Sequence, residues 1–326
     1  MRAWIVEQPG AAEAMQLERI ELPEPGPEEV RVAVRAIGIN RADILQRLGH
    51  YPPPPGFDPR IPGLEYAGVV AAVGARVQQH AVGDAVMGLL GGGAYAEQII
   101  THERDTLDIP QGLSFSEAAA IPEAFLTAYR AVFLEAALQP GQWCLVRGAT
   151  SSVGQAALQL IHALGARSIA TSRQQARLDA LAPIGFDLGL VDGSDGVAEA
   201  VQERTAGAHV VLDFVGAPAL ADNLKALRAD GTMVLVGLMG GSKTEINLGA
   251  MLMRRQRLLA MTMRSLPLER KIILAQMFND RLLPLFESGA LRPIVDREFT
   301  FEDAVAAHQY MEAGNHGGKL VLLLRE

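Results

Sequence analysis

A glycine-rich turn between an apolar strand and an apolar helix constrains the fold of this chain more than any other feature. The strand is expected over residues 143–147, and Gly148-Ala149-Thr150-Ser151-Ser152-Val153-Gly154 leads from it into the helix. A small first residue lets the chain turn tightly off the strand, and the last glycine lets the helix pack closely on the sheet. The turn therefore predicts the first strand-helix-strand unit of a dinucleotide-binding sheet. A turn with only a structural role is the alternative.

The same turn offers hydrogen-bond donors to phosphate. Backbone N–H groups at the start of a helix have no partner within it, and the helix dipole is positive at that end. Serine side chains can cap the helix and still leave room for phosphate oxygens. The residues expected to hold the pyrophosphate are Gly148, Ser151, Ser152, Val153 and Gly154.

Apolar strands and helical segments alternate from this turn onward. Such alternation indicates strand-helix-strand units in a parallel, doubly wound sheet. The strands are expected over residues 143–147, 168–172, 188–191, 210–214, 232–237 and 258–263. The helices between them are expected over residues 153–164, 174–181, 196–205 and 219–228.

The segment before this region is β-rich and irregular. Short apolar runs such as 30–36 and 69–73 are separated by clusters of proline and glycine, which is typical of a small barrel-like β domain with long loops. A change of character follows at Ser114, which has Glu117 three residues later. This spacing is a capping box and predicts the start of an Ala-rich helix.

The strand-helix alternation ends near residue 268. Two helical runs, an extended segment and a final strand follow, over residues 271–289, 301–314, 293–299 and 319–324. We therefore expect an α/β fold in which a domain with a doubly wound parallel sheet, residues 123–267, is inserted into a β-rich domain made of residues 1–122 and 268–326.

Composition excludes several classes of partner. The formal net charge is −8 and Lys and Arg form no run, so no nucleic-acid partner is expected. No apolar stretch reaches the roughly 18 residues of a membrane-spanning helix, and the N-terminus lacks a signal-peptide core, so no membrane partner and a cytoplasmic location are expected. The single cysteine, Cys144, excludes an internal disulfide and a multi-cysteine zinc cluster. We expect it to be a buried core residue rather than a reactive thiol.

The end of the second strand of the parallel sheet usually distinguishes NAD from NADP. About 20 residues past the turn, NAD-dependent enzymes place an Asp or Glu on the ribose 2′-hydroxyl. This chain has Thr171-Ser172-Arg173 there, with no carboxylate. A guanidinium suits a phosphate group, so Ser172 and Arg173 predict NADPH as the cofactor. The alternative for Arg173 is a solvated loop charge.

Motifs along the whole chain add a family resemblance. They are Asn40-Arg41-Ala42-Asp43, Gly49-His50-Tyr51-Pro52, Gly63-Leu64-Glu65-Tyr66-Ala67-Gly68, Val82-Gly83-Asp84, Ala118-Ala119-Ala120-Ile121-Pro122-Glu123, Leu126-Thr127-Ala128-Tyr129, Gly237-Leu238-Met239-Gly240-Gly241, Ala307-His308-Gln309-Tyr310-Met311-Glu312 and Gly318-Lys319-Leu320-Val321-Leu322. With these motifs the chain resembles the medium-chain dehydrogenase/reductase superfamily in its zinc-free quinone oxidoreductase branch. It is most similar to the p53-inducible quinone oxidoreductase subgroup, which shares the Pro-rich stretch after Tyr51. The resemblance implies a GroES-like β-rich catalytic domain and an inserted Rossmann domain.

The resemblance also implies that no zinc is bound. Zinc-dependent relatives have a cysteine where this chain has Asn40, a histidine where it has Leu64 and a second cysteine near Glu123. Catalytic zinc needs three nitrogen, sulfur or carboxylate ligands. Glu65 and Glu123 remain, but without thiolate or imidazole partners they make a poor zinc site.

Chemistry without a metal favours electron-poor substrates. An alcohol is hard to oxidise when nothing lowers the pKa of its hydroxyl, whereas a conjugated carbonyl needs only orientation and a few hydrogen bonds. The function expected is hydride transfer from NADPH to a quinone or related conjugated carbonyl. The alternatives are an enoyl-thioester or enone reductase and a non-enzymatic NADPH-binding protein.

Further site residues follow from the resemblance. Tyr51 is expected to donate a proton or bind an oxyanion, and Asn40 to contact the nicotinamide ribose or the substrate; packing and loop-stabilising roles are the alternatives. The remaining cofactor contacts expected are Thr127, Gly237, Leu238, Met239 and Lys319. The walls of the substrate pocket are expected to be Tyr51, Leu238, Met239, Met263 and Arg264, with core filling as the alternative for the two methionines.

Two expectations concern the cofactor phosphate and assembly. The subgroup resembles enzymes with Lys and Tyr near the 2′-phosphate, at the positions of Ala176 and Asp192, so Ser172 and Arg173 must hold it differently; a mixed or NAD preference is the alternative. Apolar strands late in the parallel sheet would leave an edge that invites pairing with a second copy. Together with the resemblance, this edge predicts a homodimer, with a tetramer as the alternative.

Overall fold

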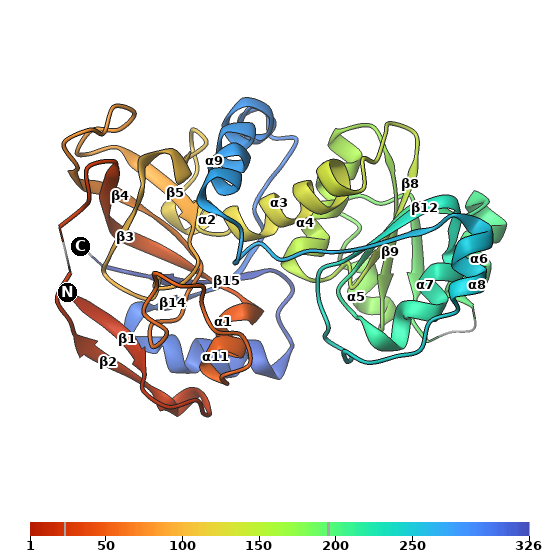
Figure 1. Cartoon of the computed structure of the whole chain (residues 1–326), viewed down its shortest axis with the longest axis horizontal. Coiled ribbons are helices and arrows are strands. Elements are labelled where there is room, and N and C mark those ends of the chain that lie inside the picture. Colours follow the sequence, from red (N-terminus) through yellow and green to blue (C-terminus); the bar gives the residue numbers. More distant parts are fainter. Residues whose placement is uncertain (23, 194–195, 326) are drawn as a thin grey trace. The chain divides into compact units, whose positions relative to one another are not determined.

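The computed structural model describes residues 1–22, 24–193 and 196–325. The chain divides into two compact units, one made of Met1–Leu126 with Met263–Glu326 and the other of Thr127–Thr262. The second unit is therefore an insertion in the first, and Figure 1 shows both units coloured along the sequence. No helix among the described residues is long and apolar enough to cross a membrane.

The first unit, which we call the outer unit, is built on a seven-stranded sheet. The strands run in the order β14-β15-β3-β4-β5-β7, and β6 also pairs with β3. All pairs are antiparallel except β14 with β15, and β1 and β2 form a separate antiparallel pair. The strands are β1 (Arg2–Val6), β2 (Met15–Arg19), β3 (Glu29–Ile39), β4 (Glu65–Val73), β5 (Ala85–Leu89), β6 (Gln98–His102), β7 (Thr106–Asp108), β14 (Val295–Thr300) and β15 (Lys319–Leu323).

Strand β3 shows why this sheet forms. Residues 29–36 alternate between half-buried and buried, and Val30, Val32 and Val34 enter one hydrophobic core together with Trp4. The indole N–H of Trp4 donates to the carbonyl oxygen of Phe301 at 2.9 Å. This bond joins the start of the chain to a segment near its end. Trp4 and Phe301 also lie in the same hydrophobic core, so the two pieces of the outer unit fold together.

The helices of the outer unit are short. They are α1 (Arg41–Arg47), α2 (Phe115–Ala118), α3 (Pro122–Tyr129, which continues past the division), α9 (Leu268–Met277), α10 (Leu283–Glu287) and α11 (Ala304–Ala313). The predicted capping box is present, since Ser114 Oγ accepts from the N–H of Glu117 at 3.3 Å and the Glu117 carboxylate accepts from the N–H of Ser114 at 2.9 Å. The helix that it opens ends at Ala118, and the chain resumes as α3 with a proline in the first helical position.

The inserted unit is a six-stranded sheet in the order β10-β9-β8-β11-β12-β13, with every pair parallel. This is the strand order of a doubly wound dinucleotide-binding sheet. Its strands are β8 (Trp143–Arg147), β9 (Arg167–Ser172), β10 (Leu188–Val191), β11 (Ala208–Asp213), β12 (Leu227–Leu235) and β13 (Arg257–Ala260). The predicted α/β fold class and the parallel order of this sheet are confirmed.

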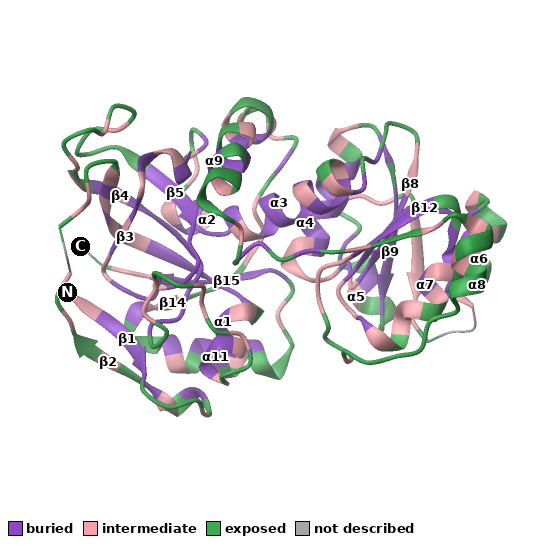
Figure 2. Cartoon of the chain, in the orientation of Figure 1, coloured by how far each residue is buried: buried purple, intermediate pink, exposed green. Residues whose placement is uncertain are grey.

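The helices of the inserted unit are α4 (Ser152–Ala163), α5 (Gln175–Asp179), α6 (Val197–Thr205), α7 (Leu220–Ala226) and α8 (Leu248–Arg254). Figure 2 shows the central strands of the sheet largely buried and α8 largely exposed. Sequence reasoning missed α8, although Asn247 is a recognisable N-cap whose Oδ1 accepts from the N–H of Ala250 at 2.9 Å. None of the residues of α8 is buried, so its apolar side chains do not repeat along one buried face. Without that repeat the segment was not recognised as a helix.

Candidate functional site

The turn after β8 has the geometry of an anion-binding helix start. Gly148 has a φ of 74°, and Ser151 caps α4 by accepting from the N–H of Gly154 at 3.1 Å while donating to Gly148 O at 2.9 Å. A Cβ on Gly154 would lie 2.7 Å from Gly148 O, so only glycine allows the helix to approach the turn this closely. The backbone N–H groups of Ser152 and Val153 have no partner within the described part of the chain.

The residues predicted to select the cofactor lie at the end of β9. Ser172 is the last residue of the strand and is buried, and its carbonyl accepts from the N–H of Asp192 at 2.8 Å. Arg173 follows it and is exposed. Its guanidinium makes no ion pair among the described residues, so it is available to an anion at this edge of the sheet.

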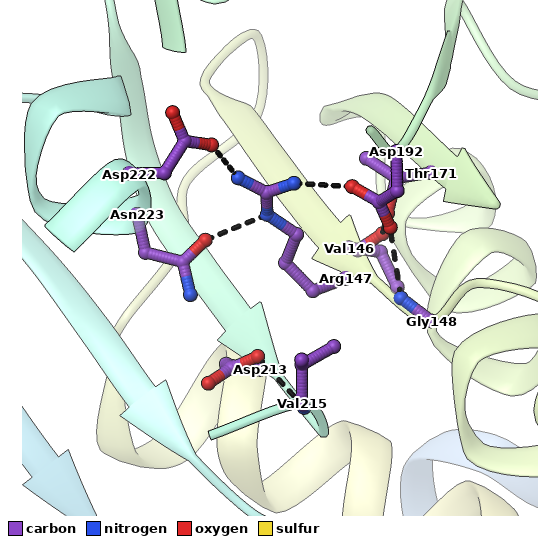
Figure 3. A network of polar contacts seen from close by, with 9 residues as sticks. All are labelled: Val146, Arg147, Gly148, Thr171, Asp192, Asp213, Val215, Asp222 and Asn223. Carbon is purple, nitrogen blue, oxygen red and sulfur yellow. Dashed lines mark hydrogen bonds and ion pairs between the residues drawn. The ribbon is translucent and has the colours of Figure 1, made fainter. Parts of the chain in front are cut away.

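A polar network that sequence reasoning missed supports the same turn. Arg147, the residue before Gly148, is 3% exposed, donates to Asn223 Oδ1 at 2.6 Å and pairs with both Asp192 and Asp222 (Figure 3). Thr171 Oγ1 donates to Asp192 at 3.0 Å. The network ties the ends of β8, β9 and β10 to helix α7. It also explains Asp192, which holds Arg147 and Thr171 rather than facing solvent as an unpaired charge.

The carboxylate of Asp213 lies at the end of β11, the strand next to β8 in the sheet. It accepts from the N–H of Val215 at 2.9 Å (Figure 3) and from the N–H of Gly216 at 3.0 Å, and these two bonds shape the loop after β11. The loop after β12 packs on this one, since a Cβ on Gly237 would lie 3.0 Å from Phe214 O. The tight approach fixes the backbone of the predicted cofactor contact at Gly237.

The other predicted contacts of the inserted unit differ in burial. Leu238 and Met239 follow Gly237 with exposures of 51% and 66%, so their side chains are open to a ligand rather than packed in the core. Thr127 is 2% exposed, and its hydroxyl is buried without a hydrogen-bond partner among the described residues. A buried orphan hydroxyl is rare in folded proteins and can be satisfied by a ligand or a water.

In the outer unit, Asn40 lies at the centre of a buried polar cluster. Its Nδ2 donates to Glu65 Oε1 at 2.9 Å and to Gly38 O at 3.2 Å, and its Oδ1 accepts from Lys319 Nζ at 2.6 Å. Lys319 also pairs with Glu65, whose second oxygen accepts from the N–H of Glu123 at 2.8 Å. The structure therefore brings Asn40 and Lys319 together, and both amide hydrogens of Asn40 are already committed.

Glu65 is the residue of this cluster to which sequence reasoning gave no role. It is fully buried, and Gly38 makes room for it, because a Cβ on Gly38 would lie 2.3 Å from Glu65 Oε1. A buried carboxylate is tolerated only when it is paired and hydrogen-bonded, and Lys319, Asn40 and Glu123 supply those partners.

Polar contacts of Asp43, three residues after Asn40, hold the start of helix α1. Asp43 accepts from the N–H of Asn40 at 2.8 Å and from the Tyr95 hydroxyl at 3.3 Å, and the same hydroxyl lies 2.9 Å from His308 Nε2. Burial raises the pKa of Asp43 to about 7. Burial and the nearby charge of Arg47 lower the pKa of His308 to about 3, so this histidine is neutral.

Tyr51 lies on the loop after α1 and is half-buried. Burial raises the pKa of its hydroxyl, the Glu123 carboxylate raises it further, and the Arg264 guanidinium lowers it. No hydrogen bond to the Tyr51 hydroxyl is found among the described residues, so the group is free to meet a ligand.

Arg264, predicted to wall the substrate pocket, is held by three hydrogen bonds. It is 3% exposed; its Nε donates to Gly91 O at 2.6 Å, its Nη1 donates to Tyr51 O at 2.5 Å, and its Nη2 donates to Gln46. Met263 beside it is buried as well. Arg264 thus braces the loop that carries Tyr51.

Two segments of the chain match known protein families. Residues 26–111 match the alcohol dehydrogenase GroES-like domain, and residues 184–322 match the zinc-binding dehydrogenase family. The quinone oxidoreductase-like protein 2 homolog of Nematostella vectensis is 31% identical over 302 residues, which are 91% of this chain and 82% of that protein. The chain belongs to the medium-chain dehydrogenase/reductase superfamily, in its quinone oxidoreductase branch. This medium-chain oxidoreductase therefore uses a nicotinamide cofactor.

Solved structures agree with this assignment. A quinone oxidoreductase of Pseudomonas syringae pv. Tomato DC3000 matches the medium-chain oxidoreductase with a TM-score of 0.89 and 29% identity over 99% of both chains. The CurK enoyl reductase matches with a TM-score of 0.88 and 27% identity, again over 99% of both. The predicted GroES-like domain with an inserted Rossmann domain is confirmed. Among the described residues, no group of three His, Cys, Asp or Glu side chains is placed to hold a metal ion.

Proposed function

We propose that this protein is a zinc-independent, NADPH-dependent oxidoreductase that reduces a quinone or a related conjugated carbonyl. The observation that carries the proposal is the turn after β8, where Ser152 and Val153 leave two backbone N–H groups unpartnered and Gly154 lets the helix start close to the turn. When bound, NADPH supplies a hydride to the electron-poor carbon of the acceptor.

The cofactor preference rests on the end of β9. The exposed, unpaired guanidinium of Arg173 and the hydroxyl of Ser172 are proposed to bind the 2′-phosphate. No carboxylate stands in the six residues after β9, and Asp192, which follows the neighbouring strand β10, is engaged by Arg147 and Thr171. These features favour NADPH over NADH.

The chemistry proposed for the outer unit depends on two groups. The Tyr51 hydroxyl is proposed to donate a hydrogen bond, and then a proton, to the carbonyl oxygen of the acceptor. Asn40 can only accept from a ligand hydroxyl, because both of its N–H groups are used within the protein. We expect no metal here, since the Lys319 ammonium already neutralises Glu65.

A second candidate function is reduction of an enoyl thioester, favoured by the likeness to the CurK enoyl reductase. Oxidation of NADPH with 1,4-benzoquinone, phenanthrenequinone and crotonyl-CoA, followed by absorbance, distinguishes the candidates. Faster turnover with either quinone supports the first proposal, and faster turnover with crotonyl-CoA supports the second. Tight NADPH binding with no turnover on any acceptor would contradict both and indicate a non-enzymatic NADPH-binding protein.

A homodimer is also proposed, formed along the edge of the parallel sheet. Strand β13 is the last strand of the sheet and is exposed at Leu258, and helix α8, which precedes it in the chain, presents Leu248, Leu252 and Met253 with exposures of 69%, 77% and 78%. A second copy would cover these apolar side chains and pair the open strand edge. The contacts of Leu238 and Met239 with substrate, and the cytoplasmic location, stay predictions.

A further inference from the structure

The inserted unit contains a cavity at the opposite end of its sheet from the phosphate turn. The cavity has a volume of about 300 Å³ and is lined by Gln142, His209, Arg228, Asp230, Thr232 and Arg257 among others. Gln142 precedes β8, His209 is near the start of β11, and Arg257 begins β13. The cavity therefore lies at the amino ends of the strands. The phosphate turn leaves the other end of β8, roughly 15 Å away along a five-residue strand.

The cavity is positively charged. Asp230 is paired with Arg255 through contacts of 2.7 and 2.8 Å, which lower its pKa, and the charges of Arg228 and Arg257 lower it further. Three arginines thus gather around one carboxylate. Within the described residues, Arg257 has no ion pair, and the only contact of the Arg228 guanidinium is with His209. Two of the three guanidinium groups form no ion pair among the described residues.

The contacts of His209 conflict with one another. The N–H of Trp143 points at Nδ1 from 3.2 Å, and Arg228 Nη1 lies 2.7 Å from Nε2. Burial and the charge of Arg228 lower the pKa of His209, so the ring is neutral and carries one hydrogen. A neutral imidazole has one acceptor nitrogen, and a guanidinium has only donors. If Nδ1 accepts from Trp143, the Nε2 hydrogen faces a hydrogen of Arg228.

A ligand acceptor that took hydrogens from both groups, with Arg228 turned away from its 2.7 Å contact with Nε2, would remove this conflict. It would take the Nε2 hydrogen of His209 and the hydrogens of the Arg228 guanidinium together, and Arg257 would add a second charge-assisted donor. Gln142 Oε1 already accepts from the N–H of Gln139 at 3.0 Å, so its amide hydrogens remain to be donated. Every polar side chain facing the cavity except Asp230 can therefore donate.

We propose that this cavity binds a phosphate group, held by Arg228, Arg257 and His209. A phosphate oxygen matches the fork of a guanidinium and has enough lone pairs for several donors at once. The phosphate can be free or part of a small phosphorylated metabolite, and either would bind outside the cofactor site. The proposal is independent of which substrate the enzyme reduces.

Nuclear magnetic resonance of the histidine side chains in the full chain, kept saturated with NADP⁺, tests the proposal. The His209 signals are assigned with His209→Gln, and inorganic phosphate is added against sodium chloride at matched ionic strength. We expect phosphate to fix His209 as the Nε2-protonated form and to shift its signals with a Kd on the order of 1 mM. No shift of the His209 signals would overturn the proposal.

Single variants locate the site. Arg228→Gln and Arg257→Gln remove exposed side chains, so the fold should tolerate them, and each is expected to weaken phosphate binding at least about tenfold. Arg204→Gln, an exposed arginine on α6, is the matched control and should leave binding unchanged. Equal weakening in all three variants would show that phosphate responds only to the overall charge of the protein, and this would overturn the proposal. An equal response to acetate would overturn the choice of phosphate.

Two ligands distinguish the source of the phosphate group. Glycerol 3-phosphate that binds more tightly than inorganic phosphate would identify a phosphorylated metabolite as the ligand. The reverse order would identify free phosphate. Either order supports a phosphate site at this cavity. These binding measurements need no turnover, so they remain informative if the proposed reductase activity is absent.

Discussion

Arg264 clamps the backbone of Tyr51 and lies over its ring at the same time. The guanidinium donates to Tyr51 O at 2.5 Å, and its central carbon is 5.0 Å from the centroid of the phenol ring. A buried cation in this position both fixes the loop and favours the ionised form of the phenol. Arg264 is thereby a positioning residue for the proposed proton donor.

The first prediction concerns this clamp. Arg264→Met should raise the pKa of the Tyr51 hydroxyl, because the charge that lowers it is removed, whereas Glu123→Gln should lower it. Incorporation of 3-fluorotyrosine and ¹⁹F resonance at increasing pH measures the midpoint, with Tyr51→Phe to assign the signal. Arg264→Lys keeps the charge and should stay nearer the wild type. Shifts in the same direction for Arg264→Met and Glu123→Gln would contradict the electrostatic account.

The second prediction concerns Tyr51 itself. Tyr51→Phe should lower kcat for an enone about 100-fold, because loss of a positioned proton donor costs at least that much, while NADPH binding is unchanged. Tyr310→Phe is the matched control, since that half-buried tyrosine donates its hydroxyl hydrogen to Asp296, which has no role in the proposed chemistry. Steady-state kinetics with both variants measure the effect. An unchanged kcat for Tyr51→Phe would remove it from the mechanism.

The third prediction concerns cofactor choice. Arg173→Ala should raise the KM for NADPH about tenfold, equivalent to about 1.4 kcal/mol, and leave the KM for NADH nearly unchanged. Arg204→Ala, also an exposed arginine of the inserted unit, should change neither. Equal effects of Arg173→Ala on both cofactors would show that Arg173 does not meet the 2′-phosphate.

The fourth prediction concerns the pH dependence of stability. Between pH 3.8 and about 7 the folded state keeps a proton on Asp43 that the unfolded chain has lost, so this group makes stability fall as the pH rises. His308 has the opposite effect between about pH 3 and 6.5, because there this histidine is protonated only in the unfolded chain. It therefore makes stability rise as the pH rises. The two effects oppose each other between pH 3.8 and 6.5.

Asp43→Asn should therefore make the free energy of unfolding rise more steeply with pH in this range, by about 1.4 kcal/mol per pH unit. The amide can still accept from Asn40 and Tyr95. Urea unfolding at several pH values measures the slope, and the exposed Asp280→Asn is the control. The same slope in Asp43→Asn and in the wild type would show that Asp43 is ionised in the folded state.

The fifth prediction concerns assembly. Leu258→Glu places a charge on the open edge of β13 and should convert the proposed dimer to a monomer, as measured by light scattering after size-exclusion chromatography. Leu268→Glu changes a similarly exposed leucine of the outer unit and should leave the dimer intact. A dimer that survives Leu258→Glu would indicate a different interface.

Local patterns explain which parts of the site were predictable from the sequence. The cap at Ser151 and the close approach at Gly154 involve residues within seven positions of one another, and their geometry follows from the turn itself. The alternation of strands and helices likewise fixed the parallel sheet, because burial on both faces gives continuous apolar runs.

Long-range polar contacts explain what was missed. Lys319 reaches Asn40 across 279 positions of the chain, and Arg264 reaches Tyr51 across 213. Arg147 at the end of β8 pairs with Asp192, which follows β10, and with Asp222 on helix α7. No periodicity or spacing in a single sequence encodes such partners, because they depend on how distant segments pack. The one available signal was an arginine at the end of a buried strand, since a buried charge requires partners.

The central claim is direct, metal-independent reduction of a conjugated carbonyl by NADPH. Reduction of an enone with NADPH deuterated at nicotinamide C4, by enzyme treated with EDTA, tests it most directly. We predict one deuterium on the β-carbon of the product and the same rate before and after EDTA. A product without deuterium, or activity that is lost with EDTA and restored by zinc, would contradict the claim.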